Sequence, residues 1–171
     1  MSGRASLPIL LCCFLVLAVT PISAQADATE DTACHPSPDW SEPQYVVGYG
    51  SLMDTLSKNR TWDDTSRPIP VRVTGFERRW NARGNLPGFS TTYLGVVEKS
   101  GATMVAAFYR VRSTRDFEAG DTREYVYCRV PVAPGQLEML NGSSPPPRGN
   151  FWIYLLKPES NRPANARFPI I

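Results

Sequence analysis

The chain has 171 residues, of which 42% are hydrophobic, 20% charged and 11% aromatic, a composition typical of one globular domain preceded by a leader. Its formal net charge is +2, from 18 basic and 16 acidic residues, and the basic residues are scattered. This near-neutral balance argues against nucleic-acid binding, which requires a marked and clustered basic excess. Sixteen prolines and twelve glycines indicate many loops and a β-rich body.

Residues 1–26 have the pattern of a secretory signal peptide. Arg4 supplies a basic start, Leu7–Val19 is apolar, and Ala24–Ala26 matches the small-x-small cleavage pattern. We therefore expect a mature chain that begins at Asp27 and is exported, either periplasmic or secreted. The alternative is an uncleaved membrane anchor, for which the apolar run is short. No other segment is apolar enough to suggest membrane contact after leader removal.

Export changes the cysteine chemistry. Cys12 and Cys13 leave with the leader, so that Cys34 and Cys128 remain. In an oxidising compartment two cysteines favour one disulfide, although the sequence is equally compatible with two free thiols. Two cysteines and the lone His35 are poor material for a zinc site, and the sequence indicates no metal.

Residues 27–43 are expected to form a polar arm before a domain at 44–171. The first half of the domain predicts, in chain order, a strand at Gln44–Gly48, a helix at Leu52–Lys58 capped by Ser51, a strand at Ile69–Trp80, a loop at Ala82–Gly88, and a hairpin of Phe89–Glu98 with Ala102–Arg112. The second half predicts a helical segment at Ser113–Asp121, a strand at Arg123–Val132, a turn at Leu137–Leu140 within a loop, a strand at Phe151–Leu156 and an irregular tail at Asn161–Ile171. Several short strands with few helices predict an α+β fold, a closed or strongly curved mixed sheet with peripheral helices.

One stretch of the domain suggests a ligand-binding turn. The apolar strand Tyr45–Val47 leads directly into Gly48 and Gly50, which permit backbone angles closed to other residues. The peptide N–H groups of such a turn can converge on an anion or on a developing oxyanion. By itself, the pattern fits an ordinary strand–turn–helix junction equally well.

A second stretch, Asp121–Arg129, places an acid among tyrosines and arginines at the predicted start of a strand. A partly desolvated carboxylate there, on Glu124, could have a pKa raised toward neutrality and transfer protons. The alternative is an ion pair of Glu124 with Arg123 or Arg129 on a solvated face. Glu118 is a further acid/base candidate, or otherwise part of a solvated helix face.

Both stretches together resemble a known family. The letters Y-G-S-L at Tyr49–Leu52 and D-x-R-E-x-x-Y-x-R at Asp121–Arg129 occur in order, with Gly75–Asn81 and Thr92–Val96 as matching blocks between them. This combination resembles the γ-glutamylcyclotransferase-like family over about Gln44–Val132. The resemblance implies a small mixed β-barrel ringed by helices.

The resemblance also implies an enzyme that cyclises a γ-glutamyl group to 5-oxoproline and releases an amine or amino acid, without a metal or organic cofactor. Carried over by position, Glu124 would be the general acid/base. The turn residues Tyr49, Gly50, Ser51 and Leu52 would hold the glutamyl head of a small-molecule substrate, and Tyr127 and Arg129 would shape or brace the pocket.

Two features leave other interpretations open. Family members usually continue past a similar proline–isoleucine pair into a closing segment. This sequence stops at Ile171, so one interpretation is a domain truncated at its C-terminus. The usual γ-glutamyl substrates are chiefly intracellular, so an exported chain could instead act on a γ-glutamyl bond elsewhere, such as in a wall peptide. It could also be a non-catalytic module that binds a carboxylate or amide ligand on the same fold, or a chain that does not fold stably. The sequence does not indicate the oligomeric state.

Overall fold

The computed structural model describes residues 33–86 and 89–170. The predicted leader, its cleavage pattern and the start of the predicted arm therefore lie outside the described residues. In the described part of the chain, no helix is both long and apolar enough to cross a membrane.

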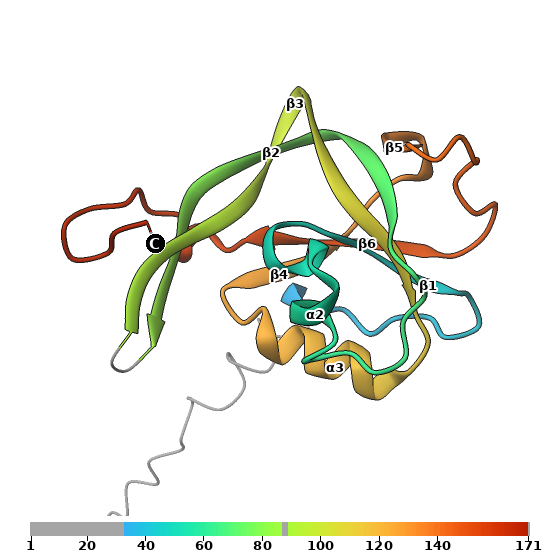
Figure 1. The fold of residues 1–171 in the computed structure, drawn as a ribbon, viewed down its shortest axis with the longest axis horizontal. Helices are drawn as coiled ribbons and strands as arrows, with labels where there is room; N and C mark the ends of the chain where they lie inside the picture. Colours follow the sequence, from blue (N-terminus) through green and yellow to red (C-terminus); the bar gives the residue numbers. More distant parts are fainter. Residues whose placement is uncertain (1–32, 87–88, 171) are drawn as a thin grey trace, which may run out of the picture.

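The domain is built on one six-stranded mixed sheet, in the order β4-β6-β1-β3-β2-β5 (Figure 1). Only β1 and β6 pair in parallel, and the other neighbours are antiparallel. The strands are β1 Gln44–Gly48, β2 Ile69–Leu86, β3 Phe89–Val111, β4 Tyr127–Pro131, β5 Leu137–Met139 and β6 Asn150–Leu156. The predicted α+β class with a mixed sheet is confirmed.

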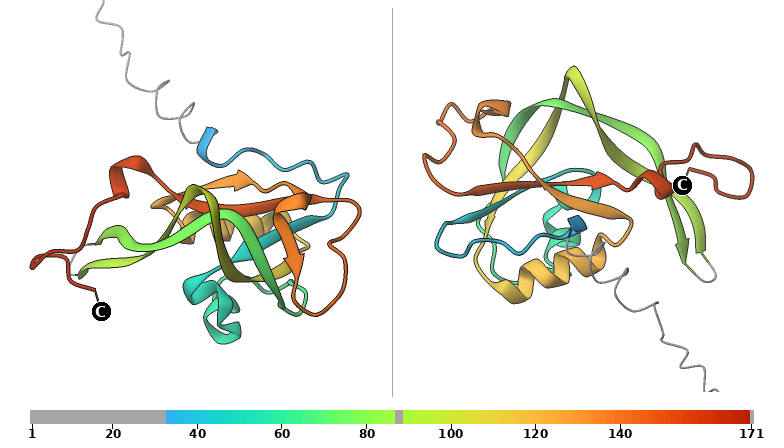
Figure 2. Two further views of the ribbon diagram at one scale, coloured as in Figure 1. Left: turned by 90° about the horizontal axis from the view of Figure 1, so that it is seen from above. Right: turned by 180° about the vertical axis from the view of Figure 1, so that it is seen from behind.

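Of the two predicted forms, closed or strongly curved, the sheet of the described residues has the second, since it stays open where the resemblance implied a barrel. Strands β4 and β5 stand at opposite ends of the strand order and are its edges. Strands β2 and β3 pair with each other along most of their length and arch away from the rest of the sheet (Figures 1 and 2). At the far edge, β5 pairs with only three residues of β2. The sheet is therefore strongly curved without closing.

The helices lie together near β1 and β6, away from the arch of β2 and β3 (Figure 1). Helix α3, Thr114–Arg123, begins where predicted, because the Ser113 side chain accepts a hydrogen bond from the Asp116 N–H at 3.1 Å. Its Phe117 packs into the same buried cluster as Val47 of β1 and Ile153 of β6. Burying each such side chain stabilises the fold by about 1.5–3 kcal/mol. This shared packing holds α3 against β1 and β6.

The predicted helix at Leu52–Lys58 is wrong in its start and its cap. The chain instead forms a 3₁₀ turn η1, Gly50–Met53, followed by a separate one-turn helix α2, Thr55–Lys58. Gly50 has a φ of +55°, so the chain leaves β1 through a left-handed residue. Asp54, rather than Ser51, caps α2 by accepting a hydrogen bond from the Ser57 N–H at 2.6 Å.

The predicted hairpin at Phe89–Arg112 is also wrong, since β3 is one continuous strand. Both of its halves pair with β2, and the residues between Glu98 and Thr103 form an irregularity opposite Gly75. The hairpin instead joins β2 to β3, where Leu86 pairs with Phe89. Most of the predicted loop at Ala82–Gly88 is therefore strand, and its residues 87–88 lie outside the described chain.

The remaining elements follow the prediction with shifted ends. Strand β1 has the predicted bounds, and β6 begins one residue early. Strand β4 begins only at Tyr127, because α3 continues to Arg123. The predicted turn at Leu137–Leu140 is instead largely the short strand β5, which follows a 3₁₀ turn η2, Pro134–Gln136.

Both ends of the described chain are held to the sheet. Cys34 and Cys128 are joined by a disulfide, which ties the arm to β4. The Arg129 guanidinium donates a hydrogen bond to the Pro36 carbonyl at 2.8 Å beside it. After the 3₁₀ turn η3, Pro158–Ser160, the predicted irregular tail returns to β3, where the Thr92 N–H donates to the Pro169 carbonyl at 2.8 Å.

Candidate functional site

The two stretches singled out in the sequence line one pocket of about 490 Å³. One wall is the turn after β1, which contributes Tyr49, Gly50, Ser51 and Leu52. The facing wall is the segment that joins α3 to β4 and includes Glu124 and Tyr127. The structure thus brings together five of the six residues predicted to bind substrate, and the predicted acid/base faces them.

Close packing fixes the turn after β1. A Cβ atom added at Gly48 would lie 2.8 Å from the Tyr109 hydroxyl and 2.9 Å from the Leu52 Cβ, so only glycine fits there. The Tyr49 hydroxyl donates a hydrogen bond to the Tyr154 carbonyl at 2.7 Å. The Leu52 N–H donates to the Tyr49 carbonyl at 3.0 Å. The glycine, the phenol and this short turn together hold the wall in one conformation.

Glu124 is held at the end of α3 rather than within a strand. Its N–H donates to the Gly120 carbonyl at 2.9 Å, and its carbonyl accepts from the Tyr127 N–H at 2.8 Å. The Glu124 side chain is only 12% exposed. Burial raises the pKa of Glu124 from 4.5 to about 7, against the opposing effect of the neighbouring Arg123. At neutral pH this carboxyl group can therefore both accept and donate a proton.

Arg123 connects Glu124 to the opposite wall. Its Nε lies 3.2 Å from Glu124 Oε1, and its Nη2 donates to Ser51 Oγ at 3.0 Å. The same guanidinium donates to the Ser57 carbonyl at 2.9 Å and to Thr61 Oγ1 at 3.1 Å. Sequence reasoning considered Arg123 only as an ion-pair partner, although its position next to Glu124 in the motif could have indicated a place in the pocket.

Tyr127 and Tyr49 supply neutral phenol groups. The Tyr127 hydroxyl donates to the Leu94 carbonyl at 3.1 Å, and its ring meets the Tyr49 ring edge to face, with centroids 6.3 Å apart. Burial raises the pKa of both phenols, and the nearby Glu124 carboxylate adds to the effect. Both side chains therefore remain protonated, which suits a packing and hydrogen-bonding role.

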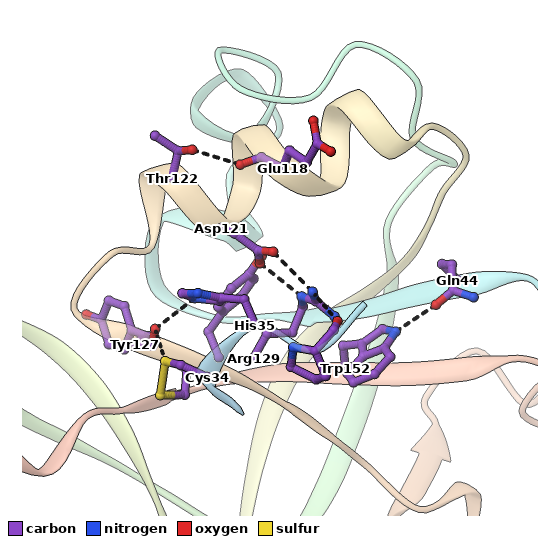
Figure 3. Close-up of polar contacts among 12 residues, drawn as sticks. Cys34, His35, Gln44, Glu118, Asp121, Thr122, Tyr127, Arg129 and Trp152 are labelled. Carbon is purple, nitrogen blue, oxygen red and sulfur yellow. Dashed lines mark hydrogen bonds and ion pairs between the residues drawn. A yellow bond between two sulfur atoms is a disulfide. The ribbon is translucent and has the colours of Figure 1, made fainter. Parts of the chain in front are cut away.

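Arg129, the sixth predicted substrate-binding residue, lies outside the pocket lining and beside Asp121, as Figure 3 shows for this pair. Its Nε and Nη2 donate to the two carboxylate oxygens of Asp121 at 2.9 and 3.1 Å. Its guanidinium lies over the rings of Phe117 and Trp152, at 4.4 and 4.7 Å from their centroids. Because Asp121 draws it under α3, Arg129 fixes the helix to the sheet and does not face a substrate.

Glu118, the second acid/base candidate, is exposed on α3 and does not line the pocket. In Figure 3 its carboxylate points away from Asp121 and Arg129. This position fits the alternative reading of a solvated helix face.

A third wall of the pocket, which sequence reasoning missed, is aromatic. Trp80 and Gly84 of β2 and Tyr93 and Leu94 of β3 line it, and Tyr125 joins them from the segment after α3. The signal in the sequence was weak, since Trp80 and Tyr93 lie within the family-like blocks but tryptophans are usually core or rim residues.

Comparison with protein-family models and with curated protein sequences finds no match. Solved structures do match. A gamma-glutamyl cyclotransferase aligns with a TM-score of 0.53 at 11% identity, over 68% of each chain. An uncharacterized protein from Homo sapiens aligns with a TM-score of 0.54 at 13% identity, also over 68% of each. A cyclotransferase specific to glutathione from yeast aligns with a TM-score of 0.51 at 14% identity, over 73% of this chain and 74% of that one.

An open mixed sheet with a pocket between the turn after β1 and the end of α3 defines an α+β protein with a cavity in the size range of small-molecule sites. More specifically, the chain has the γ-glutamyl cyclotransferase-like fold. At these identities the likeness establishes the fold, and activity has to be argued from the site.

Proposed function

We propose that the protein is a γ-glutamylcyclotransferase-like enzyme, in which Glu124 is the general acid/base that cyclises a γ-glutamyl group to 5-oxoproline. The observation that carries this proposal is a buried carboxyl group, with a pKa of about 7, in one pocket with the glycine turn. A general acid/base works best when its pKa lies near the working pH, because it must both take and return a proton.

The reaction needs one proton shuttle and no redox partner. Glu124 takes a proton from the substrate's α-ammonium, and the freed amine attacks the γ-carbonyl carbon. A new C–N bond closes the five-membered lactam, and the γ-amide C–N bond breaks as Glu124 returns its proton to the leaving nitrogen. A further proton passes from the ring nitrogen through solvent to the released amine. Because the attack is intramolecular, the main task of the pocket is to hold the substrate in the attacking conformation.

The glycine turn is proposed to stabilise the oxyanion formed on the γ-carbonyl oxygen. The Leu52 N–H is already committed to the Tyr49 carbonyl, so we assign this role to the N–H groups of Gly50 and Ser51. Leu52 then contributes its side chain to the wall. Losing one donor of this kind typically costs about 3–4 kcal/mol of transition-state stabilisation.

We further propose that the protein acts outside the cytoplasm. The leader pattern at residues 1–26 supports export, and the disulfide between Cys34 and Cys128 is of a kind that persists in oxidising compartments. The substrate would then be a γ-glutamyl compound present there.

The test is 5-oxoproline release from a panel of γ-glutamyl compounds by the purified protein. Replacement of Glu124 by glutamine (Glu124→Gln) keeps the shape of the side chain and removes its proton transfer, so we expect turnover to fall by about 10²–10⁴-fold. Glu118→Gln is the matched control on the same helix and should retain activity. Equal turnover by Glu124→Gln would remove this residue from the mechanism. A γ-glutamyl compound that stabilises the wild-type protein against heating but survives unchanged would instead identify a binding module.

A further inference from the structure

The mouth of the pocket exposes three large aromatic side chains. Trp80, Tyr93 and Tyr125 are 51%, 37% and 43% exposed, and all three line the pocket that contains Glu124. Exposed apolar side chains that gather at one site, rather than singly, commonly mark a binding surface. The three rings come from β2, β3 and the segment after α3, so the tertiary fold, and not one amphipathic element, brings them together.

One ring is held in place by a glycine. A Cβ atom added at Gly84 would lie 2.3 Å from the Tyr93 ring, so this ring packs directly on the backbone of β2. Burial raises the pKa of the Tyr93 phenol, and the nearby Tyr125 phenol adds to the effect. The Tyr93 part of the aromatic wall is therefore preformed, which lowers the entropic cost of binding a flat group against it.

The described pocket lining contains few charged side chains. Of the described lining residues, Arg123 is the only cation and Glu124 the only anion. Arg123 is engaged with Glu124, Ser51, Ser57 and Thr61. The aromatic wall thus offers no further cation to a leaving group that carries a carboxylate, as the leaving groups of glutathione and of γ-glutamyl amino acids do.

From this arrangement we infer that Trp80, Tyr93 and Tyr125 form the subsite for the leaving amine, and that the preferred substrates are γ-glutamyl amides of aromatic amines without a carboxylate. This inference rests on the proposed cyclotransferase function, because Glu124 and the glycine turn would hold the γ-glutamyl end. An aromatic ring on the leaving nitrogen then stacks on the three rings, while a carboxylate there would meet no cation in the described aromatic wall.

Four substrates separate the ring from the charge. They are γ-glutamylphenethylamide, γ-glutamylethylamide, γ-glutamylphenylalanine and glutathione, with kcat/KM measured by 5-oxoproline release. We expect the phenethylamide to exceed the ethylamide by at least about 10-fold, because burial of the ring is realised in this pocket. We expect γ-glutamylphenylalanine to fall below the phenethylamide. The inference would be overturned if glutathione or the ethylamide had a kcat/KM equal to or higher than that of the phenethylamide. A higher kcat/KM for γ-glutamylphenylalanine than for the phenethylamide would overturn it too.

Substitutions locate the preference in the aromatic wall. Trp80→Ala and Tyr125→Ala should each reduce the ratio of phenethylamide to ethylamide kcat/KM by at least about 5-fold. Trp40→Ala is the matched control, because Trp40 is 39% exposed but lies outside this pocket. Its ratio should match that of the wild type. An unchanged ratio in both wall variants, with melting temperatures near the wild-type value, would refute the subsite.

Binding to Glu124→Gln distinguishes a failed subsite from a failed function. If no compound yields 5-oxoproline with the wild-type protein, the proposed function fails, and calorimetry of the two amides with this variant still decides the subsite. A Kd for the phenethylamide at least about 10-fold lower than that for the ethylamide supports the aromatic subsite. Equal affinities, or no binding of either amide, overturn it.

Discussion

Two carboxyl groups one turn apart at the end of α3 have opposite surroundings. Asp121 accepts two hydrogen bonds from the Arg129 guanidinium and a third from the Tyr154 hydroxyl at 2.8 Å (Figure 3). Glu124 meets its arginine, Arg123, through a single ion pair at 3.2 Å and faces an open pocket. The first acid is surrounded by protein partners, whereas the second keeps acceptor capacity for a substrate. The two carboxyl groups therefore differ in their partners: Asp121 belongs to a structural ion pair, whereas Glu124 is the group proposed to transfer protons.

Removing the acid of the structural pair should have the largest effect. Asp121→Asn leaves the charge of Arg129, whose side chain is 2% exposed, buried without a counter-charge. We expect the free energy of unfolding to fall by about 3–5 kcal/mol, measured by urea denaturation. Glu118→Gln, at an exposed site on the same helix, should change it by less than about 0.5 kcal/mol. If the two variants proved equally stable, the Asp121–Arg129 pair would contribute nothing to the fold.

The same kind of change at Glu124 should act in the opposite direction. The pKa of Glu124 is raised from 4.5 to about 7 in the folded protein, so the unfolded chain releases its proton first as the pH rises. The stability that this residue contributes at low pH is therefore lost between those two values, and above about pH 7 the ionised group costs on the order of 3 kcal/mol.

Glu124→Gln should accordingly leave stability unchanged near about pH 4 and raise it by up to about 3 kcal/mol near about pH 8. Urea denaturation of both proteins at the two pH values measures this difference. If Glu124→Gln were instead less stable than the wild type at alkaline pH, favourable contacts of the Glu124 carboxylate would outweigh the cost of its burial.

The smallest effect is expected at Arg123, which tunes Glu124. Its positive charge lowers the pKa of Glu124 against the larger effect of burial. Arg123→Gln should therefore move the pKa of Glu124 above about 7, as read from the carboxyl carbon resonance in a ¹³C NMR titration. Arg72→Gln, which removes a distant ion pair with Glu138, is the control. A downward shift on loss of Arg123 would contradict the ion pair.

Much of the fold followed from local sequence. The apolar runs of β1 and β6 and the Ser113 cap of α3 each depend on neighbouring residues, and each element was predicted to within about two residues. The hairpin was misplaced because Lys99–Gly101 looks like a turn, while pairing with β2 on both sides keeps β3 continuous. Whether the curved sheet closes into a barrel could not be predicted for a similar reason, because local sequence does not determine which distant strands pair.

The site divides in the same way. The motif located the glycine turn and Glu124, because their chemistry is tied to residue type and order. Arg129 was expected to shape or brace the pocket, and only the three-dimensional structure shows that Asp121 binds it outside the pocket lining. The aromatic wall was missed for a related reason, because Trp80, Tyr93 and Tyr125 lie apart in the sequence and come together only in the folded chain.

The bond between Cys34 and Cys128 spans 94 positions, and every residue that lines the pocket lies between them. The pocket walls therefore belong to one covalent ring, and β6 and the tail follow this ring in the chain. A single backbone nick within that ring would leave its two fragments attached to each other. For a protein that acts outside the cytoplasm, as proposed, this covalent ring would keep the glycine turn and Glu124 in one molecule after a single cut.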